Sequence, residues 1–427
     1  MMLRPIITAL IICIPLVGQD LPEPPRPPES PQVPELRDYG GKYQGVVVHR
    51  LDVEPKATLH MKALRGDIIL MGTDVQRIVI EEKITVKTKY EEKAQEIIER
   101  VQGKLSPPSA SGEAYVFEVG KVGDRNVSFG YKVRVPRTFN VIIHSYGGDV
   151  DMSDLQGDLE AKTGGGDIAL SNSAGRVKVH TGGGDIDVFK VEGQVDLFTG
   201  GGDIEGRTVE GKINASTGGG DIDFWTSKGN FTINTGGGDI NLRSLEGTSV
   251  EARTGGGDIE VADVTARINL MTGGGDIYAE NITGDIEAAS SGGDLSLERI
   301  HGDAVLFSAA GDIGIRRITG AVRAKSGSGD IEIHEMSLEE PGKEESTLAT
   351  TTGDVYVNYY SKKPVDITAK IFGYSPRYAM DRIHGNVDFT YKKDNGNTVA
   401  TYSTDKPFHR IIIETTTGEI KIMKGER

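Results

Sequence analysis

One short motif, Thr-Gly-Gly-Gly-Asp-Ile, recurs along the sequence and restricts the fold more than any other feature. Gly-Asp pairs extend the pattern beyond the full motif, from Asp149 to Asp330, with intervals of 18 residues nine times and 19 once. A fixed period of this length predicts a solenoid in which each repeat forms one turn. The full motif begins at Thr163, Thr181, Thr199, Thr217, Thr235, Thr254 and Thr272.

Each repeat divides into two halves, because a second glycine follows most of the aspartates by eight residues. Apolar residues alternate with polar ones inside each half, as in Val195 and Leu197, which indicates short strands with one buried face. About five of the eighteen side chains should point inward. No helical pattern separates the strands, so each should pair with its equivalent one repeat later. The sequence therefore predicts an all-β fold, a single-stranded parallel β-helix (β-solenoid) with 18-residue rungs.

The Gly-Gly-Gly-Asp stretch itself is typical of turns. Glycine accepts the positive φ angles of sharp turns, and an aspartate carboxylate accepts hydrogen bonds from nearby backbone amides. We therefore interpret the motif first as turn chemistry.

Residues 1–18 have the layout of a secretory signal peptide, with Arg4 followed by an apolar run from Ile6 to Val17. That run contains Pro15 and is too short to span a bilayer comfortably, although an uncleaved N-terminal anchor is an alternative. The single cysteine, Cys13, lies inside it, so the mature chain should lack disulfides. We expect an exported protein, periplasmic, cell-surface or secreted, without an integral membrane segment after signal cleavage.

The remaining sequence divides into four regions. Residues 19–40 form a proline-rich linker, and residues 41–146 form a β-rich N-terminal cap with a helix near residues 90–105. Regular repeats occupy residues 147–334, and residues 335–427 form irregular rungs and a second cap, in which Thr416–Ile420 returns as a last rung. Caps are expected because a solenoid end exposes unpaired strand edges.

The net charge of −15 over 427 residues argues against a nucleic-acid partner, because phosphates would repel the chain. It also provides no basic surface for anionic membranes.

Several motifs together resemble a known family, the bacterial candidate adhesins with β-strand repeats (domain of unknown function 4097). The resemblance covers about residues 43–427 and includes Arg65–Ile68, the charged strand before the helix, Val133–Pro136, the Gly-Asp-Ile rungs and Gly418–Ile422. It implies an extracytoplasmic right-handed β-helix. The family supplies no established catalytic residues.

The stacked aspartates are candidate metal ligands. Carboxylates about 4.8 Å apart repel by about 0.9 kcal/mol per adjacent pair even in water, so backbone amides or a divalent cation should offset the charge. Calcium would be the natural cation, held by carboxylates and glycine carbonyls. A second acidic column follows at Asp187, Glu205, Asp223, Glu260 and Glu332. The candidate ligands are Asp167, Asp185, Asp203, Asp221, Asp239, Asp258 and Asp276.

A second candidate site is the position four residues after the aspartate, which reads Phe189, Arg207, Trp225 and Arg243 in consecutive rungs. If these side chains face outward, guanidinium groups stack on aromatic rings. Such a row either supports the surface or binds a glycan or a protein.

Enzymatic activity is the least favoured function. Short, uniform rungs offer no obvious groove for a polysaccharide-degrading site with paired carboxylates. The eight histidines lack metal-ligand spacing, and neither a Gly-x-Ser-x-Gly elbow nor a phosphate loop occurs. We predict a non-catalytic exported protein, without a cofactor unless calcium binds, with a structural, adhesin-like or interaction role at the cell envelope. A calcium-stabilised module that binds a glycan or a surface protein is the alternative.

Overall fold

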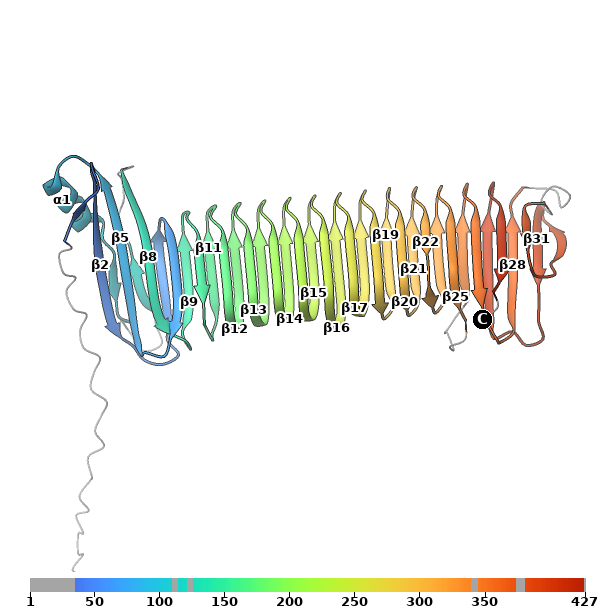
Figure 1. Cartoon of the computed structure of the whole chain (residues 1–427), viewed down its shortest axis with the longest axis horizontal. Coiled ribbons are helices and arrows are strands. Elements are labelled where there is room, and N and C mark those ends of the chain that lie inside the picture. Colours follow the sequence, from blue (N-terminus) through green and yellow to red (C-terminus); the bar gives the residue numbers. More distant parts are fainter. Residues whose placement is uncertain (1–34, 110–113, 121–125, 339–344, 374–380, 426–427) are drawn as a thin grey trace, which may run out of the picture.

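The computed structural model describes residues 35–109, 114–120, 126–338, 345–373 and 381–425. These residues form a long rod of stacked strands with one described helix, at the N-terminal end of the rod (Figure 1). The predicted all-β solenoid is confirmed. The predicted signal peptide and most of the predicted linker lie outside the described residues.

The regular part of the rod consists of strands that wrap around the rod axis and pair in parallel with the next rung. Ile186 lies opposite Ile204 and Thr199 lies opposite Thr217, so the pairing register equals the 18-residue period. The strands are β9 (Asn140–Ser145), β10 (Val150–Ser153), β11 (Leu159–Thr163), β12 (Ile168–Thr181), β13 (Ile186–Thr199), β14 (Ile204–Thr217), β15 (Ile222–Thr235), β16 (Ile240–Thr254), β17 (Ile259–Thr272), β18 (Ile277–Thr283), β19 (Ile286–Ser290), β20 (Leu295–His301), β21 (Ala304–Ser308), β22 (Ile313–Ile315), β23 (Ile318–Thr319), β24 (Val322–Ser326) and β25 (Ile331–Ser337).

The core of each rung is formed by the alternating apolar residues. In one rung the inward side chains of Val188, Val191, Val195 and Leu197 are at most 3% exposed. Thr199 is also fully buried, so a hydroxyl joins the apolar side chains in the interior. Full burial of one such aliphatic side chain contributes about 1.5–3 kcal/mol, and the stack therefore shares one continuous core.

Three bends close each rung, and the sequence predicted two of them. Most of the half-repeat glycines have positive φ, as in Gly193 at 123°. The third bend uses a residue five positions after the aspartate in the left-handed region, such as Lys190 at 53° or Thr208 at 56°. It was missed because glycine does not mark it. The other residues of this column are Asp154, Asn172, Thr226, Ser244, Asp263, Asn281 and Arg299.

The glycine triplets need a different explanation from the predicted positive φ. None of those between Gly164 and Gly275 lies in the left-handed region. Instead, a Cβ on Gly184 would lie 2.2 Å from the carbonyl oxygen of Gly166 in the previous rung. Glycine is required here because neighbouring backbones approach closely.

The N-terminal end departs from serial stacking. Its elements are β1 (Arg37–Asp38), β2 (Lys42–Asp52), β3 (Thr58–Leu64), β4 (Asp67–Thr73), β5 (Arg77–Lys87), α1 (Glu91–Val101), β6 (Lys104–Ser106), β7 (Tyr115–Glu118) and β8 (Val127–Pro136). β4 pairs in parallel with β8 on one side and with β10 on the other, while β3 lies between β7 and β9. The rung that comes first in the sequence is therefore second in space. Antiparallel β5 and β2 then close the end.

The C-terminal end repeats this arrangement. Its strands are β26 (Ser346–Thr350), β27 (Val355–Tyr360), β28 (Val365–Ile371), β29 (Ile383–Gly385), β30 (Thr390–Asp394), β31 (Asn397–Tyr402), β32 (His409–Thr415) and β33 (Ile420–Lys424). β32 lies between β26 and β28, and β33 lies between β27 and β29. The predicted last rung is thus last in the sequence but not in space, which corrects the expected order.

Candidate functional site

The predicted aspartate column forms a ladder of hydrogen bonds along one edge of the rod. The backbone N–H of Asp203 donates to Oδ1 of Asp185 at 2.8 Å, and the N–H of Asp221 donates to Oδ1 of Asp203 at the same distance. The ladder runs unbroken from Asp67 to the backbone of Glu419, through both ends as well as the middle. Hydrogen bonds to a charged acceptor are about twice as strong as neutral ones, so each carboxylate ties two rungs together.

All seven predicted metal ligands belong to this ladder, and each has one carboxylate oxygen bound to a backbone amide. Within the described residues, no three histidine, cysteine, aspartate or glutamate side chains converge in a way that could hold a metal ion. Calcium binding at Asp167, Asp185, Asp203, Asp221, Asp239, Asp258 and Asp276 stays a prediction.

A second ladder, which sequence reasoning missed, lies inside the same corner. The hydroxyl of Thr199 donates to the carbonyl of Gly184 at 2.7 Å and accepts from the N–H of Gly202 at 3.2 Å. The same hydroxyl-to-carbonyl bond recurs from Thr163 to Thr415. The signal was present, because the residue four before each ladder aspartate is always threonine or serine from Thr163 onward.

The second acidic column lies outward, two residues after the aspartates. Burial raises the pKa of the Asp187 carboxyl above its ordinary value, and the neighbouring carboxylates of Glu205 and Asp185 raise it further. Burial likewise raises the pKa of Asp223. Because Arg207 pairs with Glu205, part of this negative charge is balanced by the adjacent column.

Phe189, Arg207, Trp225 and Arg243 lie opposite one another in consecutive rungs, as a single row. The Arg207 guanidinium carbon is 5.2 Å from the centroid of the Trp225 ring, and the Lys190 amine is 4.9 Å from that of Phe189. Phe189 is 44% exposed, which places the row on the surface. The outward orientation that such a binding row requires is therefore present, and a ligand-binding role for the row stays a prediction.

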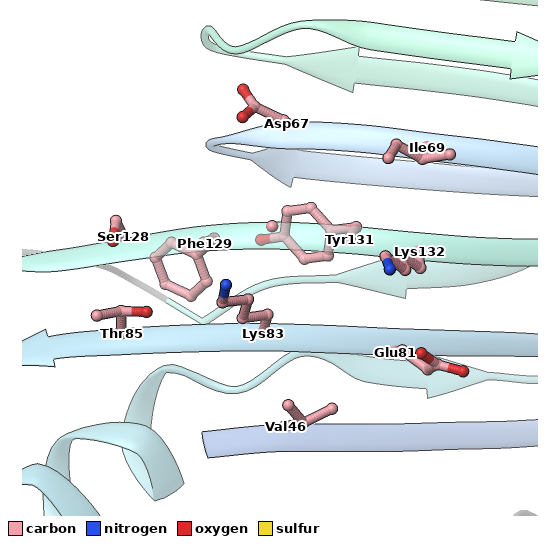
Figure 2. A pocket seen from close by; sticks show the side chains of 11 residues that line it. Val46, Asp67, Ile69, Glu81, Lys83, Thr85, Ser128, Phe129, Tyr131 and Lys132 are labelled. Carbon is pink, nitrogen blue, oxygen red and sulfur yellow. The ribbon is translucent and has the colours of Figure 1, made fainter. Parts of the chain in front are cut away.

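A hollow of about 410 Å³ lies on the N-terminal sheet, where β2, β5, β8 and β4 run side by side (Figure 2). Gly130 leaves a gap in the row of outward side chains on β8. Lys83 on β5 lies opposite this glycine, and Lys132 lies two residues further along β8. Glu81 in the same wall is paired with Arg134 at 2.7 Å. Sequence reasoning missed this hollow, although a glycine in the middle of an alternating strand was the available signal.

One buried acid–base pair lies near the helix. The Nε2 of His49 is 3.2 Å from Oε2 of Glu82, and the two side chains are 6% and 0% exposed. The same Glu82 oxygen accepts the N–H of Gly103 at 2.8 Å, just after α1. This hydrogen bond holds the chain that leaves the helix against β5, which carries Glu82. No helix in the described part of the chain is both long and apolar enough to cross a membrane.

Comparison with protein families places most of the chain in a known family. A family model described as Toastrack DUF4097 matches residues 54–234 and, in an overlapping second match, residues 207–359. The two ranges together span well over half of the 427 residues. No curated protein matches the chain.

Three solved structures are also similar. A candidate cell adhesion protein from Clostridium sporogenes is 9% identical, with 88% of this chain and 99% of that chain covered and a TM-score of 0.17. A candidate adhesin from Bacteroides fragilis is 13% identical, with 63% and 95% covered and a TM-score of 0.24. A candidate adhesin from Parabacteroides merdae is 11% identical, with 73% and 95% covered and a TM-score of 0.19.

Proposed function

The chain belongs to the Toastrack DUF4097 family, and on this premise we propose that it is a non-catalytic, adhesin-like rod that binds a partner at the bacterial cell envelope. The observation that carries the proposal is the outward row Phe189, Arg207, Trp225 and Arg243. Aromatic and arginine side chains are enriched among the few residues that carry most of the energy of protein interfaces. A row of four such side chains is therefore a ready binding strip.

The rest of the rod suits this role because it holds the strip rigidly. Each strip residue lies on a strand that is hydrogen-bonded to a rung on both sides, and the aspartate ladder ties the same rungs together. A preorganised surface loses less conformational entropy when a partner binds. Binding, rather than chemistry on a substrate, is the function that this geometry favours.

The proposed location rests on the sequence of residues 1–18, which are expected to direct export and then to be removed. A surface protein or a glycan is the proposed partner class. Nucleic acid is disfavoured because the net charge of −15 would repel phosphates.

A calcium-stabilised binding module is the second candidate, and one observation favours it. The ladder bonds end on Oδ1 of each aspartate, as in the exposed Asp185 and Asp203, so these bonds leave the second carboxylate oxygen for a cation. Calcium prefers such carboxylate oxygens together with backbone carbonyls.

Binding of the purified, fluorescently labelled protein to intact bacterial cells and to isolated envelopes tests the first proposal. Trp225→Ala should weaken binding at least about tenfold, as expected for a central aromatic contact, with an unchanged melting temperature. Phe307→Ala is the control, since Phe307 is an exposed ring outside the strip, at 43%. Equal binding of Trp225→Ala and the unmodified protein would remove the strip from the proposal. Release of reducing ends from envelope polysaccharide would contradict the non-catalytic role.

A further inference from the structure

A shallow hollow of about 150 Å³ lies on a different part of the rungs, on the strand segments that lead into the glycine corner. Its walls are two outward rows that cross β12, β13, β14 and β15 in register. The first row is Lys178, Asp196, Asn214 and Thr232, and the second is His180, Phe198, Ser216 and Asn234. The strip of Trp225 follows the ladder aspartate by four residues, whereas the second row precedes it by five, so the two surfaces are separate.

One end of the hollow is an aromatic platform. The rings of His180 and Phe198 stack with their centroids 4.6 Å apart and their planes 21° apart. Phe198 is 42% exposed, and the next residue in its row is the small Ser216. The step from a ring to a serine creates the hollow beside an open aromatic face.

The other end presents unused polar groups. Within the described part of the chain, the side chains of Ser216, Thr232 and Asn234 are half-buried and are engaged in no side-chain hydrogen bond. Hydroxyl and amide groups both donate and accept hydrogen bonds. A ligand with many hydroxyls, which also donate and accept, therefore matches this surface.

The charges beside the hollow balance, although the rod as a whole is acidic. Residues 147–334 contain 31 acidic and 15 basic residues, a net charge of −16, which slightly exceeds the −15 of the entire chain. Next to the hollow, however, Lys178 stands beside Asp196. The carboxylate of Asp196 is already engaged, because Oδ1 accepts from Asn214 at 2.5 Å and Oδ2 accepts from Gln194 at 3.0 Å. An uncharged ligand is favoured at this place.

We propose that this hollow binds a neutral carbohydrate. One sugar ring lies with its apolar face against Phe198, where aromatic and apolar surfaces are removed from water. The hydroxyls of the same sugar and of its neighbour bond to Ser216, Thr232 and Asn234. The in-register rows suit an extended oligosaccharide that runs along the rod, since successive rungs offer new contacts about every 4.8 Å. The proposal goes beyond the envelope-binding role, because it names a ligand class and a second surface.

The test uses the purified full chain on an array of neutral oligosaccharides of glucose, mannose, galactose and N-acetylhexosamines, followed by calorimetry with the best binder. Phe198→Ala should lower the affinity at least tenfold. Phe307→Ala is a matched control because it lies in the same row, is equally exposed at 43%, and has Ala289 and Lys325 as its register neighbours. Its affinity should be unchanged.

Further variants separate this site from other surfaces. Ser216→Leu should fill the hollow and abolish sugar binding while the melting temperature stays within a few degrees, and Trp225→Ala should leave sugar binding intact. Failure of the strip proposal is therefore distinguishable from failure of this one. The inference is overturned if no neutral oligosaccharide binds at millimolar concentration, if only charged glycans or peptides bind, or if Phe198→Ala binds as well as Phe307→Ala.

Discussion

The middle of the rod and its two ends use the same corner chemistry but follow different rules of order. In the middle, β12 to β17 stack in the order of the sequence, and each rung pairs with the rung 18 or 19 residues away. At the ends, β3 and β4 lie inside β7 and β8, and β32 and β33 lie inside β28 and β29 (Figure 1). The aspartate ladder nevertheless reaches into both ends, to Asp67 at the start of β4 and to Glu419 just before β33.

This difference separates two requirements of a solenoid. Adding rungs to the rod needs only a corner motif that stacks on the same motif in the next rung, so the stability of the middle depends on contacts between neighbouring rungs. Ending the rod needs a different arrangement, because the final rung of a serial stack would leave an open core and an unpaired strand edge. In both ends the chain leaves a place in the stack of strands empty, and a later segment of the chain fills it. The ends are therefore formed by strands that are far apart in the sequence.

The largest expected effect comes from comparing two deletions, one of a rung in the middle and one of the last rung in the sequence. Deletion of residues 204–221 joins Asp203 to Ile222 and leaves every register intact, so the protein should keep both ends and melt cooperatively. Deletion of residues 409–427 removes β32 and β33, with four fully buried isoleucines, Ile411, Ile413, Ile420 and Ile422. The lost burial is about 6–12 kcal/mol at 1.5–3 kcal/mol per side chain.

Hydrogen exchange should show the contrast between these deletions, with loss of protection over residues 361–373 and 381–408 only in the C-terminal deletion. Equal protection of that segment in both proteins would show that closure does not need the returning rung.

The next prediction concerns the glycine corner, which the middle of the rod and its ends share. Gly202→Ala places a Cβ 2.1 Å from the carbonyl oxygen of Gly184, and should destabilise the protein by about 2–3 kcal/mol. Gly418→Ala at the C-terminal end meets Gly353 at 1.8 Å and should cost as much. Gly201→Ala is the control, because nothing lies within 4 Å of its Cβ. Chemical denaturation measures all three, and a harmless Gly418→Ala would mean that the corner is looser at the ends.

A smaller effect is expected at the left-handed bend, in the middle of the rod. Thr226 holds φ at 49° in the left-handed bend, which is strained for a β-branched residue. Thr226→Asn should stabilise the protein by about 0.5–1 kcal/mol, because asparagine tolerates this conformation better. Thr265→Asn, at an extended position, should be neutral or slightly destabilising in the same melts. A stabilising Thr265→Asn with an inert Thr226→Asn would exclude backbone strain as the cause.

The last prediction is that calcium leaves the melting temperature unchanged. If backbone amides satisfy the ladder from Asp67 to Asp354, excess chelator and millimolar calcium at fixed ionic strength should give the same melting temperature. A ligand at 100 times its dissociation constant stabilises the native state by about 2.7 kcal/mol. A calcium-specific rise would favour the calcium module and return Asp167 to Asp276 to the list of metal ligands.

Local periodicity made the middle of the rod predictable. The Gly-Asp spacing sets the register of every rung from Asp149 to Asp330, and the alternation of apolar residues identifies the inward side chains, because both depend on neighbouring residues alone. The helix was expected near residues 90–105 and is observed at Glu91–Val101, since the chain leaves it at Gly103 to form β6.

The missed features depend on other information. The left-handed bend carries Lys190 or Thr208 rather than glycine, so no residue type marks it. The order of the ends is decided by pairing partners far apart in the sequence, such as Ser346 and Ile411, which no local pattern reports. The hollows arise from small residues, Gly130 and Ser216, beside large ones on other strands. These hollows can be recognised only once the strand register shows which side chains are neighbours.

The inward position of β33 has a mechanical consequence. Tension that reaches β33 from the residues that follow it acts on a rung that is bonded to β27 on one side and β29 on the other (Figure 1). From there the load spreads along the rod through interfaces such as that of β13 and β14, which meet at thirteen registered positions. Because these backbone bonds act in parallel, no single bond carries the full force. A rod held by this end would withstand a pull better than one whose last strand lay at the edge.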